Sequence, residues 1–225
     1  MKLSHIILIA TILPVTAFAE TSDQPQSNST KAYIGFNVHY LRAQLNDKVG
    51  ETFSYASSSS TDTNELINPN HSGLSLNIGA QFDDNFSLEA FLEHISSSTA
   101  DIDFYYTGNK ISHYKSKTSG LAFGLDAMGY APITDTKFSF IGSFGVGYYK
   151  FDGEFNVVNY VTNAELSESG DETNVAFRIG FGGQYAFAEN LALRGMVRYI
   201  ALNSDDNEDA VDGLIDISLG LKYTF

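Results

Sequence analysis

Eight charged residues stand inside short segments that otherwise alternate between apolar and small polar residues. They are four acids and four bases: Glu89, Glu93, Asp126, Asp216, Arg178, Arg194, Arg198 and Lys222. All occupy the alternating position that also carries Gly, Ser, Asn and Gln, which puts them on one side of a sheet. An isolated charge shut away from water is prohibitively costly, so these groups must pair. The sequence therefore predicts a salt-bridge network in an enclosed lumen.

Spacing from the nearest short turn predicts how these charges are layered. Glu89 and Arg194 come at similar distances from their turns, so they should meet. Glu93 and the set Arg178, Arg198 and Asp216 lie further along their segments, and the latter three should share one layer. Lys222 comes close to the chain end and should lie near a wet mouth. Two roles remain open: a plug that fixes strand register, and a gate whose ion pairs exchange partners. About eight strands leave no continuous aqueous channel, which favours the plug.

An acidic segment offers oxygen ligands at a spacing that resembles a calcium loop. Asp205, Asn207, Asp209 and Asp216 fall at positions one, three, five and twelve of an EF-hand-like pattern. Ala210 replaces the turning glycine of that pattern, and Asp216 belongs to an alternating segment. A solvated acidic loop is the expectation, and no metal site or cofactor is predicted.

The composition excludes several classes of protein. The 225 residues include 27 Asp and Glu against 13 Lys and Arg, a net charge of -14, and no Cys. So acidic a chain has no basic surface for nucleic acid. Without cysteine there is no disulfide, thiolate zinc site or catalytic thiol.

The elements that must position the charges are eight alternating segments with a period of two. They cover residues 32–40, 73–82, 86–93, 121–128, 138–149, 175–185, 191–199 and 214–225. Short turns at 83–85, 132–136 and 188–190 alternate with long polar stretches at 43–72, 95–118, 152–173 and 201–212. One face of every segment is bulky and apolar and the other small and polar, which is the reverse of a soluble lipocalin-like barrel. The pattern predicts an all-β, eight-stranded antiparallel up-and-down transmembrane barrel.

Two of the long stretches differ from the others in composition: the first contains a run of four serines at 57–60, and the second is rich in aromatic residues. Residues 104–106 are Phe-Tyr-Tyr, and His113 and Tyr114 stand beside Lys110, Lys115 and Lys117. Exposed tyrosines among polar neighbours suit partner recognition. The alternative is that these residues extend the third and fourth strands beyond the membrane and pair with each other. The two interpretations can hold together.

A hairpin pattern recurs in the chain. Residues 78–88, with Gln81-Phe82 before an acidic turn ending in Asn85, are similar to residues 181–193, with Gln184-Tyr185 before Glu189-Asn190. With the eight-strand spacing and a last alternating segment ending on Phe225, the chain resembles the small outer-membrane β-barrel family typified by the OmpA transmembrane domain and OmpX. The resemblance implies that Leu219, Leu221, Tyr223 and Phe225 form the signal read by the barrel-assembly machinery. The chain departs from OmpA itself in that it ends at this segment, so we expect no periplasmic peptidoglycan-binding domain after it.

A second resemblance concerns a histidine and a serine that are separated by one residue. Outer-membrane lipid A deacylases are barrels that use a His-x-Ser pair near the outer leaflet, and His94 and Ser96 are similar to it. A carboxylate would have to orient the imidazole for the hydroxyl to attack an ester. Ser97 stands where that family tends to have Asn, and no third member is assignable, so no catalytic residue is predicted.

The ends of the chain complete the predicted organisation. Residues 1–19 have a basic start, an apolar core and an Ala17-Phe18-Ala19 cleavage site, which is typical of a signal peptide. Residues 20–30 form a disordered lead-in, and 31–225 the barrel. We expect an integral protein of the cell outer membrane. Its expected role is non-enzymatic, supporting envelope integrity or presenting loops for adhesion, with a lipid A-modifying enzyme or a narrow low-conductance pore as alternatives. Expected partners are outer-membrane lipid, lipopolysaccharide and a host or surface ligand.

Overall fold

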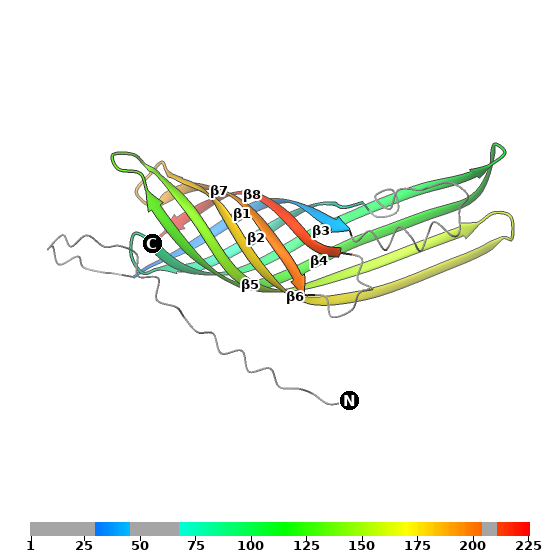
Figure 1. The fold of residues 1–225 in the computed structure, drawn as a ribbon, viewed down its shortest axis with the longest axis horizontal. Coiled ribbons are helices and arrows are strands. Elements are labelled where there is room, and N and C mark those ends of the chain that lie inside the picture. Colours follow the sequence, from blue (N-terminus) through cyan, green and yellow to red (C-terminus); the bar gives the residue numbers. More distant parts are fainter. Residues whose placement is uncertain (1–29, 46–67, 204–210) are drawn as a thin grey trace, which may run out of the picture.

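The computed structural model describes residues 30–45, 68–203 and 211–225. They form eight strands: β1 (Lys31–Leu45), β2 (Asn70–Gln81), β3 (Phe86–Tyr106), β4 (Asn109–Pro132), β5 (Phe138–Asn159), β6 (Ala164–Ala186), β7 (Leu191–Asn203) and β8 (Val211–Thr224). Each strand pairs antiparallel with the next, and β8 pairs with β1, so the sheet closes into a barrel (Figure 1). The predicted fold is confirmed. The predicted signal peptide and nearly all of the predicted lead-in lie outside the described residues.

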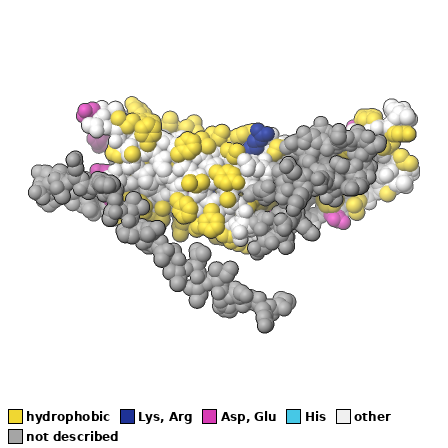
Figure 2. Space-filling model, viewed as in Figure 1, with side chains coloured by type: hydrophobic (Ala, Val, Ile, Leu, Met, Phe, Trp, Pro, Cys, Tyr) yellow, Lys and Arg dark blue, Asp and Glu magenta, His cyan; other side chains and the backbone are white. Residues whose placement is uncertain are grey.

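The outer surface of the barrel wall is apolar because alternate residues of every strand point away from the lumen. Phe36, Phe123 and Phe144 leave 51%, 53% and 59% of their surface exposed. Figure 2 shows this apolar surface along the barrel wall. So large an apolar surface is stable only against lipid. We call it the membrane belt. No helix among the described residues is long and apolar enough to cross a bilayer.

Aromatic residues gather where the membrane belt meets the short turns. The rings of Phe82 and Phe86 stack at 5.8 Å, and those of Tyr223 and Phe225 meet edge to face at 5.2 Å. Tyr40, Tyr148 and Tyr199 lie exposed at the opposite edge of the belt. Amphipathic rings at both edges are typical of a membrane-spanning barrel.

Two of the predicted long loops are strands. The interpretation that residues around 104–114 extend the third and fourth strands and pair with each other is confirmed, whereas the loop expected at 152–173 is wrong. β3 and β4 stay paired from Ser98 opposite Thr118 to Tyr106 opposite Asn109. β4 and β5 stay paired up to Ser112 opposite Asn159, and β5 and β6 up to Asn159 opposite Ala164. Figure 1 shows these four strands running far beyond the ends of the other four. We call their extension, residues 98–119 and 152–171, the projecting sheet.

The physical reason for the error is that the projecting sheet meets no lipid. Its strands carry polar residues on the outer face and mixed residues on the other, so the apolar alternation that marks the membrane belt stops. The β3–β4 turn is built by Thr107 and Gly108, whose φ angles are +47° and +82°. Two residues with positive φ form the tight turn that matches the twist of paired strands.

Candidate functional site

The lumen side of the strands holds the charged residues in layers. In the layer towards the short turns, both oxygens of the Glu89 carboxylate accept hydrogen bonds from Arg194, at 2.6 and 3.1 Å. The Asn77 amide also donates to Glu89. Glu89 and Arg194 expose 0% and 2% of their surface. A bidentate pair that is also hydrogen-bonded is the geometry in which two buried charges are tolerated.

Lys222 lies on the short-turn side of this pair and lines the cavity at that end of the barrel, although its own side chain is buried. It is 2% exposed, and its ammonium donates to Gln81 at 3.0 Å. The ammonium lies 4.1 Å from the centre of the Tyr33 ring and 5.0 Å from that of Tyr130. Two aromatic faces thus solvate a cation that makes no ion pair with any described residue.

A polar cavity opens below Lys222 at the short-turn end. Its volume is about 460 Å³, and Lys31, Gln81, Asp83, Gln184, Glu189 and Lys222 are among the residues that line it. Met128, Tyr130, Ile141 and Met196 form a separate buried apolar cluster inside the barrel.

The second layer contains an ion pair that connects the last two strands. Arg198 donates to Asp216 at 3.0 Å and to Ser218 at 2.8 Å. Asp216 also lies 2.9 Å from Nδ1 of His39. Sequence reasoning missed His39, although the alternation of β1 puts it on the lumen side. Its side chain is 1% exposed.

Arg178 does not join Arg198 and Asp216 directly, which differs from the predicted single cluster. Its guanidinium lies 3.8 Å from Glu93 and 3.5 Å from Asp126, and 3.7 Å from the centre of the Phe91 ring. These ion pairs are longer than hydrogen bonds, and both carboxylates lack a hydrogen-bond partner among the described residues. Arg178 therefore sits between two acids on β3 and β4 and across the ring of Phe91.

A glycine makes room for this group. Gly145 faces the lumen on β5, opposite both Asp126 and Arg178. A Cβ atom at Gly145 would overlap the Asp126 carboxylate and the Leu125 carbonyl oxygen. The wall must therefore lack a side chain here for the acid to turn inward.

Three uncharged residues connect the two layers. His39 Nε2 lies 2.7 Å from the Ser75 hydroxyl, which donates to Asn77 Oδ1 at 2.9 Å. Asn37 donates to both Ser75 and Asn77, at 2.8 and 3.0 Å. Because Asn77 donates to Glu89, a continuous hydrogen-bonded path runs from Asp216 to Glu89. Ser75, Asn77 and Asn37 were not singled out from the sequence either.

The end of the lumen towards the projecting sheet is filled with apolar side chains. They are Leu41, Ala43, Phe91, Ile95, Ala122, Tyr149, Ala176, Ile200 and Leu214, each at most 8% exposed. This apolar cluster packs on the side of the charged layers that faces the projecting sheet.

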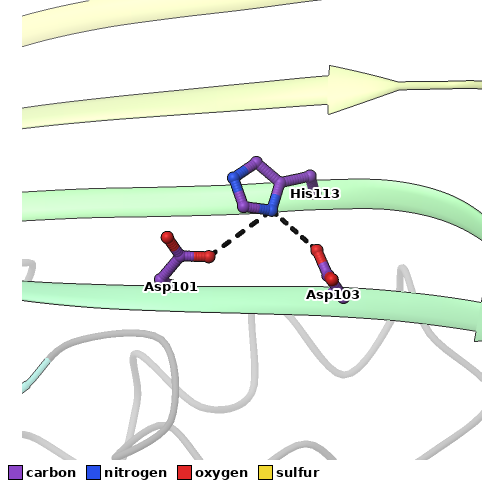
Figure 3. Close-up of side chains that lie close together, drawn as sticks. All are labelled: Asp101, Asp103 and His113. Atoms are coloured by element: carbon purple, nitrogen blue, oxygen red, sulfur yellow. Dashed lines mark hydrogen bonds and ion pairs between the residues drawn. The ribbon is translucent and has the colours of Figure 1, made fainter.

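The projecting sheet carries a group with metal-ligand chemistry, shown in Figure 3. On its outer face, His113 Nδ1 lies 2.7 Å from Asp103 and 3.5 Å from Asp101. Asp103 and His113 are directly opposed on β3 and β4. Lys110 already pairs with Asp103 at 2.5 Å. Hydrogen bonds from Lys110 and then from His113 hold the pKa of Asp103 below its ordinary value. Lys110 and His113 thus already occupy the Asp103 carboxylate.

The other residues considered from sequence are placed as follows. His94 is exposed and Ser96 half-buried, with a bulge between Ile95 and Ser98. Neither side chain contacts the other or a carboxylate among the described residues. Asp205, Asn207 and Asp209 lie outside the described residues, whereas Asp216 is committed to Arg198 and His39. Leu219, Leu221, Tyr223 and Phe225 point outward on the membrane belt. Their role as an assembly signal stays a prediction.

A closed antiparallel barrel with a lipid-facing belt and a packed polar lumen defines an integral outer-membrane β-barrel protein. The chain belongs to the outer membrane protein beta-barrel domain family, whose model matches residues 6–225. A search of curated proteins finds no match. In such barrels the short turns are periplasmic and the long connections extracellular, so the projecting sheet stands outside the cell.

Solved structures with the same fold have little sequence in common with this chain. A major outer membrane protein from Thermus thermophilus is 13% identical with a TM-score of 0.55, covering 88% of this chain and 100% of its own. The N-terminal β-barrel domain of Pseudomonas aeruginosa OprF is also 13% identical, with a TM-score of 0.51 and coverages of 88% and 100%. These likenesses concern the fold alone.

Proposed function

We propose that this protein is a non-enzymatic surface-binding protein, in which the barrel is the membrane anchor and the projecting sheet presents the binding residues. The observation that carries the proposal is that four of the eight strands remain paired well beyond the membrane belt. A sheet of this length is not needed to close the barrel. Rigid scaffolds that hold surface residues in place are typical of recognition proteins.

The tips of the two hairpins supply the contact residues. Tyr105, Tyr106 and Val161 expose 63%, 66% and 72% of their surface. Tyr160 is 46% exposed, and Lys110 of the neighbouring hairpin lies 5.2 Å from the centre of its ring. This contact places the Tyr160 ring against the hairpin that carries Tyr105 and Tyr106. Tyrosine offers a large contact area at a small cost in conformational entropy.

The experiment compares adherence of bacteria that display the protein to an epithelial cell monolayer. Replacing Tyr105, Tyr106 and Tyr160 together by Ser should reduce adherence at least tenfold. The control replaces Ser167 and Ser169, exposed residues of β6 below the tip, by Ala and should adhere like the parent. Equal surface amounts and a heat-modifiable gel shift verify that each variant is folded. Unchanged adherence of the tyrosine variant would contradict the proposal.

Support of envelope integrity is the second candidate, favoured by the filled lumen. A barrel that conducts nothing can strengthen a membrane without a ligand. Cells lacking the protein should then become more sensitive to detergent, and the tyrosine variant should restore resistance fully. A variant that restores neither resistance nor adherence would point to misfolding, which the gel shift detects.

A further inference from the structure

The charges in the lumen balance in number but not in place. Arg194 donates to both oxygens of Glu89, and Arg198 donates to Asp216. These two ion pairs leave a second set of buried charges that are not matched one to one among the described residues. The set consists of Lys222, which lies against two tyrosine rings, and of the group Arg178, Glu93 and Asp126.

In the group around Arg178, two acids share one guanidinium. Arg178 lies 3.8 Å from Glu93 and 3.5 Å from Asp126, and within the described part of the chain neither acid has another ion pair. His39 contacts Asp216 instead. With both carboxyls ionised, the group therefore carries one negative charge in excess. Glu93 and Asp126 are 0% and 1% exposed, so bulk water cannot compensate for this charge.

The oxygens of this group also lack hydrogen bonds. All four carboxylate oxygens of Glu93 and Asp126 are buried without a hydrogen-bond partner among the described residues, and so is the hydroxyl of Tyr149. Tyr149 is itself 0% exposed. A buried polar atom left unsatisfied costs free energy, and the cost is largest for a charged group. These oxygens therefore call for a positively charged partner.

The pairing register of the sheet leaves space between these oxygens. Glu93 on β3, Ala122 on β4 and Tyr149 on β5 stand in one row of the barrel wall. Neighbouring strands lie about 5 Å apart, so Glu93 and Tyr149 start about 10 Å from each other, a distance that their two long side chains can span above Ala122. Asp126 likewise stands beside Gly145, which has no side chain.

We propose that the lumen binds one monovalent cation of the size of Na⁺ between Glu93 and Asp126, with the Tyr149 hydroxyl as a further ligand. Carboxylate and hydroxyl oxygens are the ligands that hard cations prefer. Arg178, whose guanidinium lies 3.7 Å from the centre of the Phe91 ring, supplies one positive charge to the two acids, and the cation supplies the second. A divalent ion would replace an excess negative charge by an excess positive one.

A cation at this place would connect three consecutive strands. Glu93, Asp126 and Tyr149 belong to β3, β4 and β5, the strands that continue into the projecting sheet. Because the three side chains come together only in the folded barrel, the bound cation stabilises that state by mass action. The proposal concerns the lumen and is independent of what the projecting sheet binds.

The test measures urea unfolding of the refolded barrel in detergent while Na⁺ replaces choline at constant ionic strength, so that screening by salt stays the same. Raising Na⁺ from about 10 mM to about 300 mM should raise the unfolding midpoint of the parent. Glu93→Gln and Asp126→Asn each remove the excess charge, so their midpoints should not depend on Na⁺. The matched control Asp103→Asn, which removes an acid of the projecting sheet, should keep the dependence of the parent.

Two outcomes of this titration would overturn the proposal. A parent midpoint that is the same in Na⁺ and in choline would mean that one of the two acids carries a proton instead. Loss of the Na⁺ dependence in Asp103→Asn as well would place the cation outside the lumen.

A crystallographic measurement covers the case in which a lumen variant fails to fold. Crystals of the parent barrel grown with thallium(I), which takes the place of monovalent cations and scatters anomalously, should show one anomalous peak in contact with Glu93 or Asp126. Thallium peaks only on the outer surface, or none at all, would contradict a cation site in the lumen.

Discussion

Individual lumen residues differ in whether their removal leaves a buried charge without a partner. Asp216 is 0% exposed and depends on Arg198 and His39 for compensation. Lys222 has no carboxylate partner among the described residues and rests between two tyrosine rings. Removing one member of a buried ion pair leaves the other charge buried without compensation. Removing a cation that has no ionic partner leaves no such charge.

Arg198→Ala should therefore destabilise the barrel more than Lys222→Ala. We expect a loss of about 3–5 kcal/mol for Arg198→Ala, the usual cost of breaking a buried pair. Lys222→Ala should cost about 1–2 kcal/mol, the magnitude of a desolvated cation–π contact. Urea unfolding of both variants in detergent measures the difference. Equal unfolding midpoints of the two variants would contradict this prediction.

A second prediction at the residue scale concerns the outer face of the projecting sheet. Because hydrogen bonds from Lys110 and His113 lower the pKa of Asp103, its carboxyl should titrate below its ordinary value of 3.8. The interaction is present above that pH and is lost as the pH falls through the lowered value. Carbon NMR of the Asp103 carboxyl gives the midpoint. In Lys110→Met the midpoint should move back up, and an unmoved midpoint would show that Lys110 is not the cause.

The lumen charges could be predicted because alternation places each residue on one face, and a buried charge must pair. Two observations were enough to predict the pairs Glu89–Arg194 and Arg198–Asp216: the face of the strand on which each residue lies, and its distance from the nearest short turn. The partner of Arg178 could not be predicted, since it depends on the inward space that Gly145 leaves beside Asp126. His39 was missed because a histidine on a mixed face looks ordinary until its two neighbours are known.

At the scale of the strand, glycines separate tolerant from intolerant positions of β5. A Cβ at Gly145 would overlap the Asp126 carboxylate, whereas nothing lies within 4 Å of a Cβ at Gly142, which points outward. Gly145→Ala should thus destabilise the barrel by about 1–3 kcal/mol, the cost of overpacking. Gly142→Ala is the matched control and should leave the unfolding midpoint unchanged. Equal effects of the two changes would show that the Asp126 side chain can move aside at little cost in stability.

The strands also show where the sequence pattern no longer predicts secondary structure. Inside the membrane the lipid imposes a strict alternation, so all eight strands were predictable to within a few residues. In the projecting sheet water meets the outer face, and pairs such as Asp103 with His113 stabilise it instead of apolar contacts. Polar stretches of this kind are indistinguishable from loops when only periodicity is considered.

The molecule as a whole combines a closed anchor with an extracellular sheet. Among the described residues, the charged layers and the apolar side chains around Tyr149 and Ile200 pack inside the lumen. What the chain adds to the minimal barrel is the continuation of β3 to β6 outside the membrane. A preformed sheet would hold the tip tyrosines in place, whereas flexible loops would have to be ordered on binding at an entropic cost.

The central claim is that the projecting sheet is folded in the absence of any ligand. Amide hydrogen exchange of the barrel in detergent or nanodiscs tests it most directly, because paired strands protect their amides. We predict exchange at least a hundredfold slower than in an unstructured peptide for the inner-strand amides of 111–118 on β4 and 152–158 on β5. Exchange at the unstructured rate throughout these segments would mean that they are loops, and the account of a rigid binding platform would be wrong.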